Sequence, residues 1–462
     1  MARDIDPVLN RRAFLGGALS ATALSLATPV GAQSSQLQAS LRSSLDITRY
    51  GVRPGALDNQ SVAFQQAINA ASAEGQPLFV PGGDYLLSNI DLPSNLTLIG
   101  VPGQTRIRYA GDGHLFFGAG IQNVRLEGLT FDGANRPLAD YAPALIHIST
   151  GANIGINDIT VLGSLKHGIQ IDRVSGRIER STLTGIMEAA IMSNEAEGLA
   201  IRDNVITDCA DNGILVHRWN KGRDGSIIMG NRIDRIRSRS GGTGPFGNAI
   251  NTFRADDVMI ANNIIDDNDF SAIRCNACNN VQIIGNHCRD SGEVAIFVEF
   301  GFQGSVVANN VIDGAATGIH IANFLEGGRM AVVQGNLIRN MTIQSRFPTG
   351  EEAYGRGVYV EADTNVTGNI IENAPFAGAS IGWGPYLRNV IFSNNIVRKT
   401  EAGVKVSVVD GVGTTVIKDN IFEEARLGAV VGTNWYQTVT GELAGLRELP
   451  TPLTIEGNQI LS

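Results

Sequence analysis

The sequence contains few cysteine residues, and their positions argue against a disulfide-stabilised scaffold. Only four are present in 462 residues, Cys209, Cys275, Cys278 and Cys288, which is too few and too clustered for a disulfide framework. Cys275 and Cys278 form a single C-x-x-C motif, without a second pair or a histidine couple at metal-ligand spacing. Because Cys275 and Cys288 fall where the repeat described below has apolar residues, we expect buried free thiols rather than a zinc or redox site.

Charged and aromatic residues are also scarce. Charged residues make up 18% of the sequence and aromatic residues 6%, whereas glycine occurs 55 times. This composition is typical of many short strands joined by turns and disfavours a helical bundle. The formal net charge of −9 argues against general nucleic-acid binding, because a basic surface is needed to bind a phosphate backbone.

Several common catalytic motifs are missing. The sequence has no G-x-S-x-G motif, no phosphate-binding glycine loop and no dinucleotide-binding fingerprint. Serine hydrolase, kinase and Rossmann-type functions are therefore set aside.

The N-terminal segment, from Met1 to Gln33, has the pattern of an export signal. Arg11 and Arg12 precede a mildly apolar stretch, and Val30-Gly31-Ala32 forms a small-residue cleavage site. The apolar stretch is short and rich in small and hydroxyl residues, which disfavours a membrane span. The segment RRAFLGG resembles a twin-arginine signal, which implies export of the folded protein to the periplasm or beyond by the twin-arginine (Tat) machinery. An ordinary secretory signal that contains two arginines is the alternative.

The dominant feature of the remaining sequence is a repeat with a period of about 23 residues. A small residue followed by alternating apolar residues recurs at Gly168, Ala190, Gly213, Ala249, Ala272, Ala295, Gly318, Gly357, Gly378, Gly403 and Gly428. Two of the steps between these starts are markedly longer than the others. Alternating apolar positions predict short strands. Strands this short cannot bury their apolar side alone, so we expect them to stack coil upon coil in parallel sheets.

A second phrase, an apolar strand ending in asparagine, alternates with the first. The recurrent residues are Asn231, Asn263, Asn286, Asn310, Asn336, Asn369, Asn395 and Asn420. Asparagine tolerates left-handed backbone and can stack as a hydrogen-bonded ladder. We interpret this series as structural.

The repeats from about residue 120 to 460, together with segment 47–100, resemble the pectate-lyase-like superfamily of right-handed parallel β-helices. The resemblance implies an all-β solenoid, a right-handed single-stranded parallel β-helix with an N-terminal helical cap. We expect the cap helix to begin at Asp58 or Asn59 and to end at Gly75, so that it covers the edges of the first coil. Its predicted apolar face consists of Val62, Phe64, Ala67, Ile68 and Ala71.

The predicted organisation is a signal peptide over residues 1–32, a linker with the cap helix and first strands over 33–119, and repeats with a C-terminal cap over 120–462. With its leader, the whole chain resembles a family of twin-arginine-translocated repeat proteins, and this resemblance implies no particular reaction. In the C-terminal stretch 434–452, Trp435 and Tyr436 either cover the last coil or stack on sugars.

Two outward positions in each coil predict a polar stripe on one face. In GIQID, Ile169 and Ile171 should point inward, which leaves Gln170 and Asp172 outside. The position four after each start gives Asp172, Asn194, His217, Phe253, Asn276, Glu299, Ala322, Glu361 and Gly382, and the position two after adds Asn251, Arg274, Phe297, His320 and Tyr359. This mixture suits proton transfer and glycan binding.

The two long steps in the repeat insert about 13 and about 16 residues, around 235–247 and 340–356. Both insertions precede the small-residue strand, so we expect them to leave the same edge and to form two walls beside the stripe, where binding loops commonly gather. The stretch from His217 to Arg239 also has an excess of basic residues. It either attracts a polyanion such as a uronic-acid glycan or balances acidic neighbours.

The residues of the stripe fit elimination chemistry on a uronate. Removal of the C5 proton needs a base, a group that neutralises the adjacent carboxylate and an acid for the leaving oxygen. His217 or His320 is the candidate base, Arg254 or Arg274 the neutralising group and Tyr359 the acid. Alginate epimerases of the superfamily have a Tyr-Gly-Phe-Asp-Pro-His type motif, and NGILVH has Leu215 where their aspartate stands, which argues against close kinship.

Glycoside hydrolysis is the second candidate reaction. Glu299 and Glu361 lie two coils apart in the same outward column, roughly 10 Å along the axis, near the spacing that inverting hydrolases use. Adjacent aspartates such as Asp256-Asp257 and Asp266-Asp267 fall in predicted turns, where we interpret them as structural. No loop motif supports a calcium ion between carboxylates.

The sequence thus predicts an exported polysaccharide-processing protein, with lyase chemistry on an acidic glycan ahead of inverting hydrolysis and of non-catalytic glycan binding. The candidate catalytic residues are His217, Arg274, Glu299, His320, Tyr359 and Glu361. The candidate substrate-binding residues are Asn194, Arg218, Asn251, Arg254 and Asn276. No metal ligands and no nucleic-acid partner are predicted.

Overall fold

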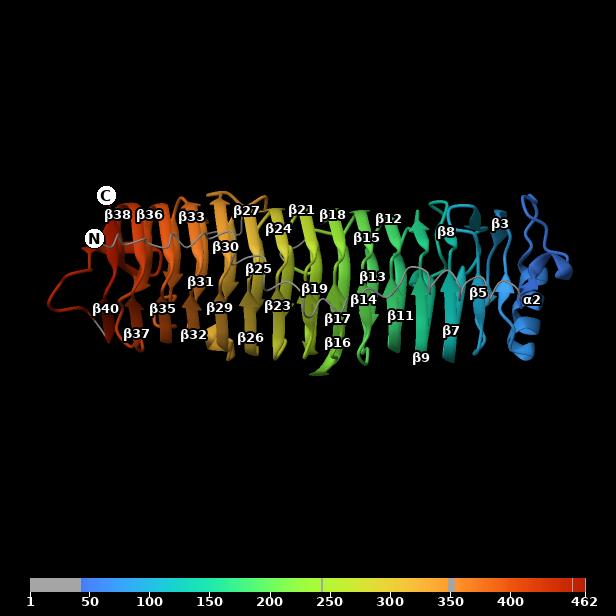
Figure 1. The fold of residues 1–462 in the computed structure, drawn as a ribbon, viewed down its shortest axis with the longest axis horizontal. Coiled ribbons are helices and arrows are strands. Elements are labelled where there is room, and N and C mark those ends of the chain that lie inside the picture. Colours follow the sequence, from blue (N-terminus) through green and yellow to red (C-terminus); the bar gives the residue numbers. More distant parts are fainter. Residues whose placement is uncertain (1–42, 242–243, 348–353, 451, 462) are drawn as a thin grey trace, which may run out of the picture. The chain divides into compact units, whose positions relative to one another are not determined.

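The computed structural model describes residues 43–462 apart from 242–243, 348–353, 451 and 462, so the predicted leader lies outside the described residues. From Leu45 onward the chain forms one compact unit. Its strands stack coil upon coil along one axis, and the single α-helix of the described residues, α2, lies at the blue end of the stack, beside the first strands (Figure 1). Neighbouring coils pair in parallel, as predicted, whereas strand β39 pairs antiparallel with β38 at the C-terminal end. No helix in the described part of the chain is long and apolar enough to cross a membrane.

The strands form three parallel sheets, one for each side of the coil. The first sheet, which holds the candidate site, contains β4 (Ile90–Asp91), β7 (Phe116–Glu127), β9 (Ala144–Asn157), β11 (His167–Glu179), β13 (Ala189–Asn194), β16 (Asn212–Arg223), β19 (Asn248–Asp256), β22 (Ile273–Asn276), β25 (Val294–Glu299), β28 (Thr317–Ile321), β31 (Arg356–Val360), β34 (Ala377–Ile381), β36 (Ile396–Ser407) and β38 (Ile421–Asn434).

The long strands β7, β9 and β11 begin in the first sheet, and their C-terminal ends pair in the second sheet. Its other strands are β1 (Leu45–Asp46), β2 (Leu78–Phe79), β5 (Thr97–Ile99), β14 (Ala200–Arg202), β17 (Ile227–Met229), β20 (Met259–Ala261), β23 (Val281–Ile284), β26 (Gln303–Ala308), β29 (Arg329–Gln334), β32 (Ala362–Thr367), β35 (Arg388–Ser393), β37 (Thr415–Lys418) and β40 (Leu453–Glu456).

The N-terminal ends of β36 and β38 pair in the third sheet, and both strands continue into the first. Its other strands are β3 (Gly83–Leu87), β6 (Thr105–Tyr109), β8 (Thr130–Asp132), β10 (Thr160–Leu162), β12 (Thr182–Ile186), β15 (Val205–Cys209), β18 (Arg232–Ile236), β21 (Ile264–Asn268), β24 (His287–Ser291), β27 (Val311–Ala315), β30 (Leu337–Met341), β33 (Ile370–Ala374) and β41 (Gln459–Leu461). Strand β39 spans Gln437–Glu442, and two short 3-10 helices, η1 and η2, span Ile47–Tyr50 and Phe324–Glu326.

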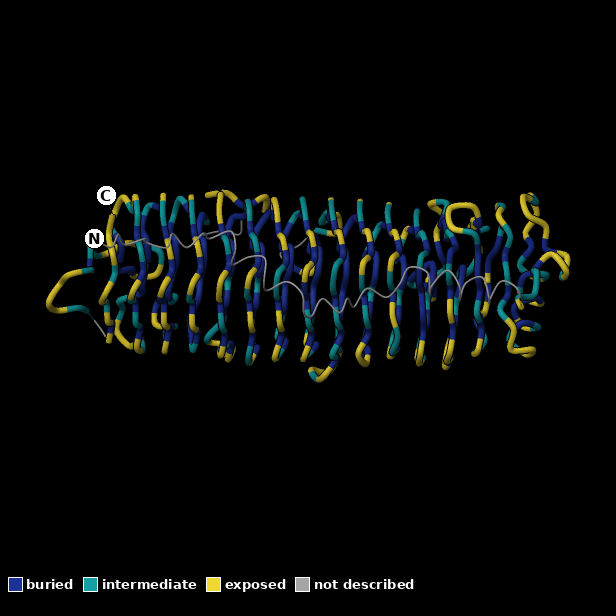
Figure 2. Tube along the Cα trace, in the orientation of Figure 1, coloured by how far each residue is buried: buried dark blue, intermediate teal, exposed yellow. Residues whose placement is uncertain are grey.

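The core lies inside the coils. Inward residues of one sheet stack on the equivalent residues of the next coil, as Ile250, Ile273 and Ile296 do, and all three are fully buried. Figure 2 shows buried and exposed segments recurring at equivalent places in successive coils. All four cysteines are buried and free, and burial raises the pKa of the Cys288 thiol to about 12. The burial predicted for Cys275 and Cys288 is therefore confirmed.

An asparagine ladder joins the second sheet to the third, as predicted. In each step one side-chain oxygen accepts two hydrogen bonds from the previous asparagine, so that Asn310 Oδ1 accepts from Asn286 N at 2.9 Å and from Asn286 Nδ2 at 3.0 Å. The Asn286 Nδ2 also donates to the Ile260 carbonyl at 3.0 Å. Because these partners are buried, the ladder satisfies polar groups that would otherwise be expensive to bury.

The ladder asparagines themselves are not in the left-handed conformation, contrary to the prediction. The residue immediately before each one is left-handed instead, for example Asn262 with φ 55°, Gly285 with φ 68° and Asn309 with φ 57°. That residue makes the sharp turn and needs no side-chain partner inside the coil, whereas the next asparagine must point inward to bond its neighbours. Because the first residue must adopt the left-handed conformation and the second must be asparagine, the second repeated phrase contains Gly-Asn, Asn-Asn or Asp-Asn at this turn.

The predicted cap helix is α2 (Ser61–Glu74), which ends at Gly75 in the left-handed conformation with φ 64°. Asn59 Oδ1 accepts a hydrogen bond from Ser61 N at 2.9 Å, and the Phe64 ring packs against Tyr85 and Phe116 of the first coils. One predicted face residue is wrong: Val62 is 75% exposed. It lies in the first turn, outside the face formed by the four buried residues.

Candidate functional site

The predicted polar stripe is formed by two outward columns of the first sheet. In one column Asn251, Arg274, Phe297, His320 and Tyr359 stand in register on consecutive strands. In the other column Asn194, His217, Phe253, Asn276 and Glu299 do so. Since consecutive strands are about 4.8 Å apart, side chains of neighbouring coils contact one another. The predicted register of these residues is confirmed, while their roles stay a prediction.

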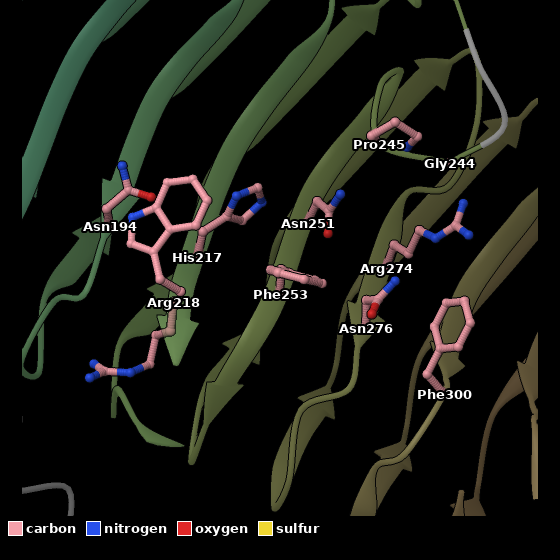
Figure 3. A pocket seen from close by; sticks show the side chains of 11 residues that line it. Asn194, His217, Arg218, Gly244, Pro245, Asn251, Phe253, Arg274, Asn276 and Phe300 are labelled. Carbon is pink, nitrogen blue, oxygen red and sulfur yellow. The ribbon is translucent and has the colours of Figure 1, made fainter. Parts of the chain in front are cut away.

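A first cavity of about 370 Å³ opens on this stripe. Six predicted site residues line it together with three aromatic residues and two residues of the first insertion (Figure 3). The lining residues are Asn194, His217, Arg218, Trp219, Gly244, Pro245, Asn251, Phe253, Arg274, Asn276 and Phe300.

The first insertion closes on this cavity because glycine allows it to approach. Gly244 has φ 134°, and a Cβ atom there would lie 2.6 Å from Nη1 of Arg274. Asn248 Nδ2 donates to the Gly244 carbonyl at 2.7 Å, and Asn212 Nδ2 donates to the Pro245 carbonyl at 3.1 Å. These bonds hold the described end of the insertion against the stripe.

Five buried polar atoms of the residues that line the first cavity have no hydrogen-bond partner among the described residues. They are Oδ1 of Asn194, Nε2 of His217, Nε of Arg218, Oδ1 of Asn251 and Nη1 of Arg274. Buried polar atoms of proteins are normally hydrogen-bonded. The Arg218 guanidinium is ion-paired with Glu195, and the other four atoms are available to a polar ligand. Burial, with His167 nearby, lowers the pKa of His217 to about 4, so that its imidazole is neutral at pH 7.

The charge of Arg274 is already compensated within the sheet. Its Nε donates to Glu299 Oε1 at 2.6 Å and its Nη2 to Oε2 at 3.0 Å. Asn276 Nδ2 donates to the same Oε1 at 3.0 Å, and the guanidinium carbon lies 4.9 Å from the Phe297 ring centroid. Glu299 is buried by these contacts and lines neither cavity. Arg274 can therefore donate a hydrogen bond but is poorly suited to neutralising a second carboxylate.

A second cavity of about 260 Å³ lies further along the same columns. It brings together the predicted residues His320, Tyr359 and Glu361. The His320 ring stacks between Phe297, with centroids 4.6 Å apart, and Tyr359, with centroids 4.2 Å apart. Glu361 Oε2 accepts a hydrogen bond from the backbone N of Phe324 at 2.6 Å, so the 3-10 helix η2 fixes the orientation of this carboxyl.

Burial shifts the protonation of all three predicted residues. The pKa of His320 is lowered well below its usual value by burial and by Arg356 and Arg274. The pKa of Tyr359 is raised well above its usual value by burial and by the Glu361 charge. Burial raises the pKa of Glu361 to about 7, although the Phe324 amide and the Tyr359 hydroxyl favour its ionised form. At neutral pH the cavity thus contains a neutral imidazole, a neutral phenol and a carboxyl near its midpoint.

Sequence reasoning missed Arg356, Trp383 and the position of Tyr436 in the second cavity. The Arg356 guanidinium carbon lies 4.6 Å from the Tyr359 ring centroid and 5.5 Å from that of Tyr436. Trp383 packs edge-on against Tyr436 with centroids 4.4 Å apart. These residues come from positions outside the repeated phrase, so the period could not identify them. The predicted aromatic pair at the C-terminus was the only sequence signal.

Trp219 and Phe300 were also missed as lining residues of the first cavity. Trp219 directly follows two predicted site residues and is 72% exposed, so an aromatic residue just beyond the stripe was an available signal. Arg254 lines neither cavity. Its Nη1 donates to the Trp219 carbonyl at 2.9 Å, and its guanidinium carbon lies 4.8 Å from the Phe253 ring centroid. Arg254 therefore supports the rim of the first cavity.

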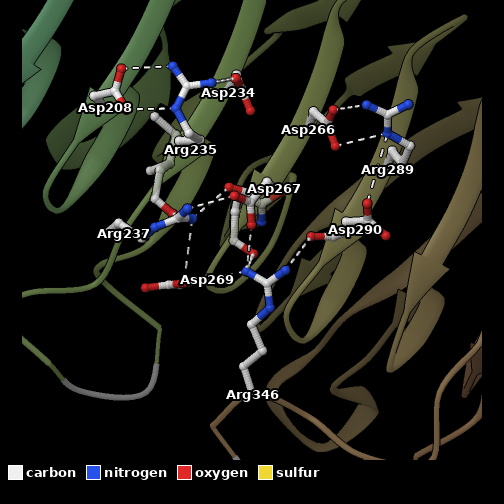
Figure 4. A network of polar contacts seen from close by, with 12 residues as sticks. Asp208, Asp234, Arg235, Arg237, Asp266, Asp267, Asp269, Arg289, Asp290 and Arg346 are labelled. Carbon is white, nitrogen blue, oxygen red and sulfur yellow. Dashed lines mark hydrogen bonds and ion pairs between the residues drawn. The ribbon is translucent and has the colours of Figure 1, made fainter.

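The described parts of the two insertions do not form separate walls. Arg237, from the first insertion, and Arg346, from the second, both bind Asp267, at 2.6 and 2.9 Å (Figure 4). The Phe347 ring also stacks on Phe270 with centroids 4.7 Å apart. The described part of the second insertion therefore folds back along the edge of the stack and meets the first.

Most arginines of the basic stretch are ion-paired. Arg218 binds Glu195 at 2.7 Å and Arg235 binds Asp208 at 2.7 Å, in addition to the pair between Arg237 and Asp267. These contacts favour the interpretation that the stretch balances acidic neighbours. Within the described ranges, no group of three or more His, Cys, Asp or Glu side chains could hold a metal ion.

Several solved structures are similar to the chain in fold. The pre-mature gene product 12 of bacteriophage phi29 is 15% identical, with a TM-score of 0.51 over 94% of this chain and 74% of that one. The GH87 α-1,3-glucanase catalytic unit of Streptomyces thermodiastaticus is 18% identical, with a TM-score of 0.45 over 90% and 68%. The A-module of Azotobacter vinelandii mannuronan C-5 epimerase AlgE6 is 16% identical, with a TM-score of 0.39 over 90% and 99%. No curated protein matches the sequence.

Two family models match the sequence itself. The model described as rhamnogalacturonase A/epimerase, pectate lyase-like, matches residues 44–120, the region of the cap and first coils. The model of the right-handed β-helix region matches residues 144–326 and 224–387, which together span more than half of the 462 residues. The predicted superfamily resemblance and fold class are thereby confirmed, and the chain belongs to the right-handed β-helix family.

Proposed function

We propose that this chain is an exported enzyme that binds an acidic polysaccharide along the two outward columns and cleaves it by β-elimination. The observation that supports this proposal best is the second cavity, in which a cation, a neutral phenol and a carboxyl near its midpoint line one space of about 260 Å³. Export depends on the leader, which lies outside the described residues.

The first cavity has the chemistry of a sugar-binding site. Its aromatic residues Trp219, Phe253 and Phe300 offer apolar surface to the C–H groups of a sugar ring. Its unpartnered amide and imidazole atoms can exchange hydrogen bonds with hydroxyl groups. A cavity that combines apolar walls with a few oriented polar groups is the usual form of a small-ligand site.

The second cavity has the groups that elimination requires. The Arg356 guanidinium can neutralise the uronate carboxylate, which makes the C5 proton easier to remove. The neutral Tyr359 hydroxyl can protonate the leaving oxygen as the C4–O bond breaks. In this assignment Arg356 takes the role that the sequence suggested for Arg254 or Arg274.

Inverting hydrolysis by Glu299 and Glu361 is less well supported by the geometry. An inverting hydrolase needs two carboxyl groups that face the substrate with a water molecule between them. Glu299 is bound by Arg274 and Asn276 and lines neither cavity. Among the described residues that line the second cavity, Glu361 is the one carboxyl. One carboxyl among the described lining residues fits elimination better than hydrolysis.

The test is incubation of the purified chain with a panel of acidic and neutral polysaccharides, with two signals recorded. Ultraviolet absorbance from unsaturated uronate ends together with new reducing ends would support a lyase, whereas reducing ends alone would indicate a hydrolase. Tyr359→Phe should abolish both signals, and Gln170→Ala, which changes an outward residue outside both cavities, should not. Binding without either signal would contradict the proposed reaction and indicate a non-catalytic glycan-binding protein.

A further inference from the structure

We propose that Glu361 is the base of the reaction, that Tyr359 is the acid, and that the proton returns from Glu361 to Tyr359 after each elimination. This inference rests on the proposed function. It deepens that function because it assigns the two proton transfers to one pair of neighbouring side chains.

The geometry of the pair supports direct proton exchange. Tyr359 lies near the end of β31 and Glu361 directly follows the strand, so their side chains project from the same face, and both line the second cavity. The Tyr359 hydroxyl interacts with the Glu361 carboxyl and favours its ionised form, which lowers the pKa of that carboxyl. The backbone amide of Phe324 fixes Glu361 Oε2 at 2.6 Å, so the carboxyl is oriented before substrate binds.

His320 is a poorer base than Glu361, although its Nε2 has no partner among the described residues. Its imidazole is stacked between two rings, and the neighbouring charges of Arg356 and Arg274 oppose a further positive charge. A general base works best when its pKa is close to the working pH. The pKa of about 7 at Glu361 meets this condition, whereas the strongly lowered pKa of His320 does not.

The proposed cycle balances without any co-reactant. The Glu361 carboxylate takes the C5 proton, and the electron pair of the C5–H bond forms the C4=C5 double bond. The C4–O bond breaks, and its electron pair goes to the leaving oxygen, which takes the proton of the Tyr359 hydroxyl. The Tyr359 phenolate then takes the proton from Glu361, and both residues regain their initial state.

Within the described part of the chain, few other titratable groups surround Glu361. The remaining titratable residues that line the cavity are His320, Tyr354, Arg356 and Tyr436. Asp363 of β32 and Arg388 of β35 form an ion pair at 2.5 Å, and Lys405 of β36 pairs with Glu401 at 2.8 Å, so the charges within each pair compensate each other. A titration observed near pH 7 in this cavity should therefore belong to Glu361.

The first experiment measures the pH dependence of kcat/KM on polygalacturonate and on alginate. For the wild type we expect a tenfold rise per pH unit up to about 7 and a plateau above it. In Glu361→Gln this rise of kcat/KM with pH, the acidic limb of the profile, should be absent, and kcat should fall at least about 100-fold. Binding of the polymer should change little. Glu361→Asp should restore part of the rate, and its acidic limb should lie at a different pH from that of the wild type. In His320→Gln the acidic limb should lie at the same pH as in the wild type.

A second experiment measures the titration of the Glu361 carboxyl in the absence of substrate. The infrared difference between wild type and Glu361→Gln should show one carboxyl that titrates near pH 7, and Tyr359→Phe should move that titration to higher pH because a donor to the carboxylate is lost. An unchanged titration in Tyr359→Phe would overturn the paired mechanism. A Glu361→Gln variant that keeps the wild-type limb would overturn Glu361 as base but leave the lyase assignment intact. A wild type that cleaves neither polymer nor any other uronate polymer would overturn both.

Discussion

Replacement of Glu361 by glutamine should stabilise the protein at neutral and alkaline pH and have much less effect in acid. The Glu361 residue is only 5% exposed, so the ionised form of its carboxyl loses most of its hydration in the folded state. Glutamine has nearly the same shape, stays uncharged, and can still accept the hydrogen bond from the Phe324 amide. The substitution therefore removes the charge and retains the packing.

The size of the effect follows from the change in pKa. Burial raises the pKa of Glu361 from an ordinary value of 4.5 to about 7. One pKa unit corresponds to about 1.4 kcal/mol, so the rise corresponds to about 3 kcal/mol. Below pH 4.5 the carboxyl is protonated in both states and no energy is lost. Between 4.5 and 7 the unfolded chain ionises first, so the stability of the wild type falls with rising pH until the full loss is reached above 7.

Urea denaturation of the wild type and Glu361→Gln at several pH values would measure this difference. We expect the stability advantage of the variant to grow from pH 4 to pH 8 by about 3 kcal/mol. Glu326→Gln is the matched control, because Glu326 lies in the neighbouring η2 and is exposed to solvent. A difference between wild type and Glu361→Gln that does not change with pH would refute the reasoning, because the carboxyl would then ionise alike in both states.

Three further predictions concern the ladder, the buried ion pair and the first cavity. Asn310→Ala removes one side chain of the ladder and leaves buried polar groups unpaired, so unfolding experiments should show a loss of about 3 kcal/mol; a loss below about 1 kcal/mol would contradict the importance of the ladder. Arg274→Met leaves the Glu299 charge buried without its partner and should cost about 3–5 kcal/mol. Glu299→Gln in that background should recover part of this loss, and no recovery would argue against an uncompensated charge. Trp219→Ala should weaken binding of a polysaccharide about tenfold in calorimetry, since a lost aromatic contact corresponds to about 1.4 kcal/mol; an unchanged Kd would exclude sugar contact at this rim.

The sequence by itself determined the repeated parts of this protein. The repeat period of about 23 residues, the alternation of apolar residues and the recurrent asparagines predicted the parallel solenoid, the ladder and the register of the outward columns. Each coil contacts mainly its two neighbours, so the same local pattern recurs in the sequence wherever it recurs in space. For this reason His320 and Tyr359 could be placed side by side on neighbouring strands, although the second insertion separates them in the chain.

Only the tertiary structure decided which outward residues face a cavity and in which state of charge. The ion pair that withdraws Glu299 from the stripe depends on the lengths and rotamers of two side chains, and the pKa of Glu361 depends on its burial beneath η2. Arg356 and Trp383 reach the second cavity from positions outside the repeated phrase. The insertions meet at Asp267 because one of them folds back along the stack. Such contacts join residues far apart in the chain without a shared period, so no local sequence pattern records them.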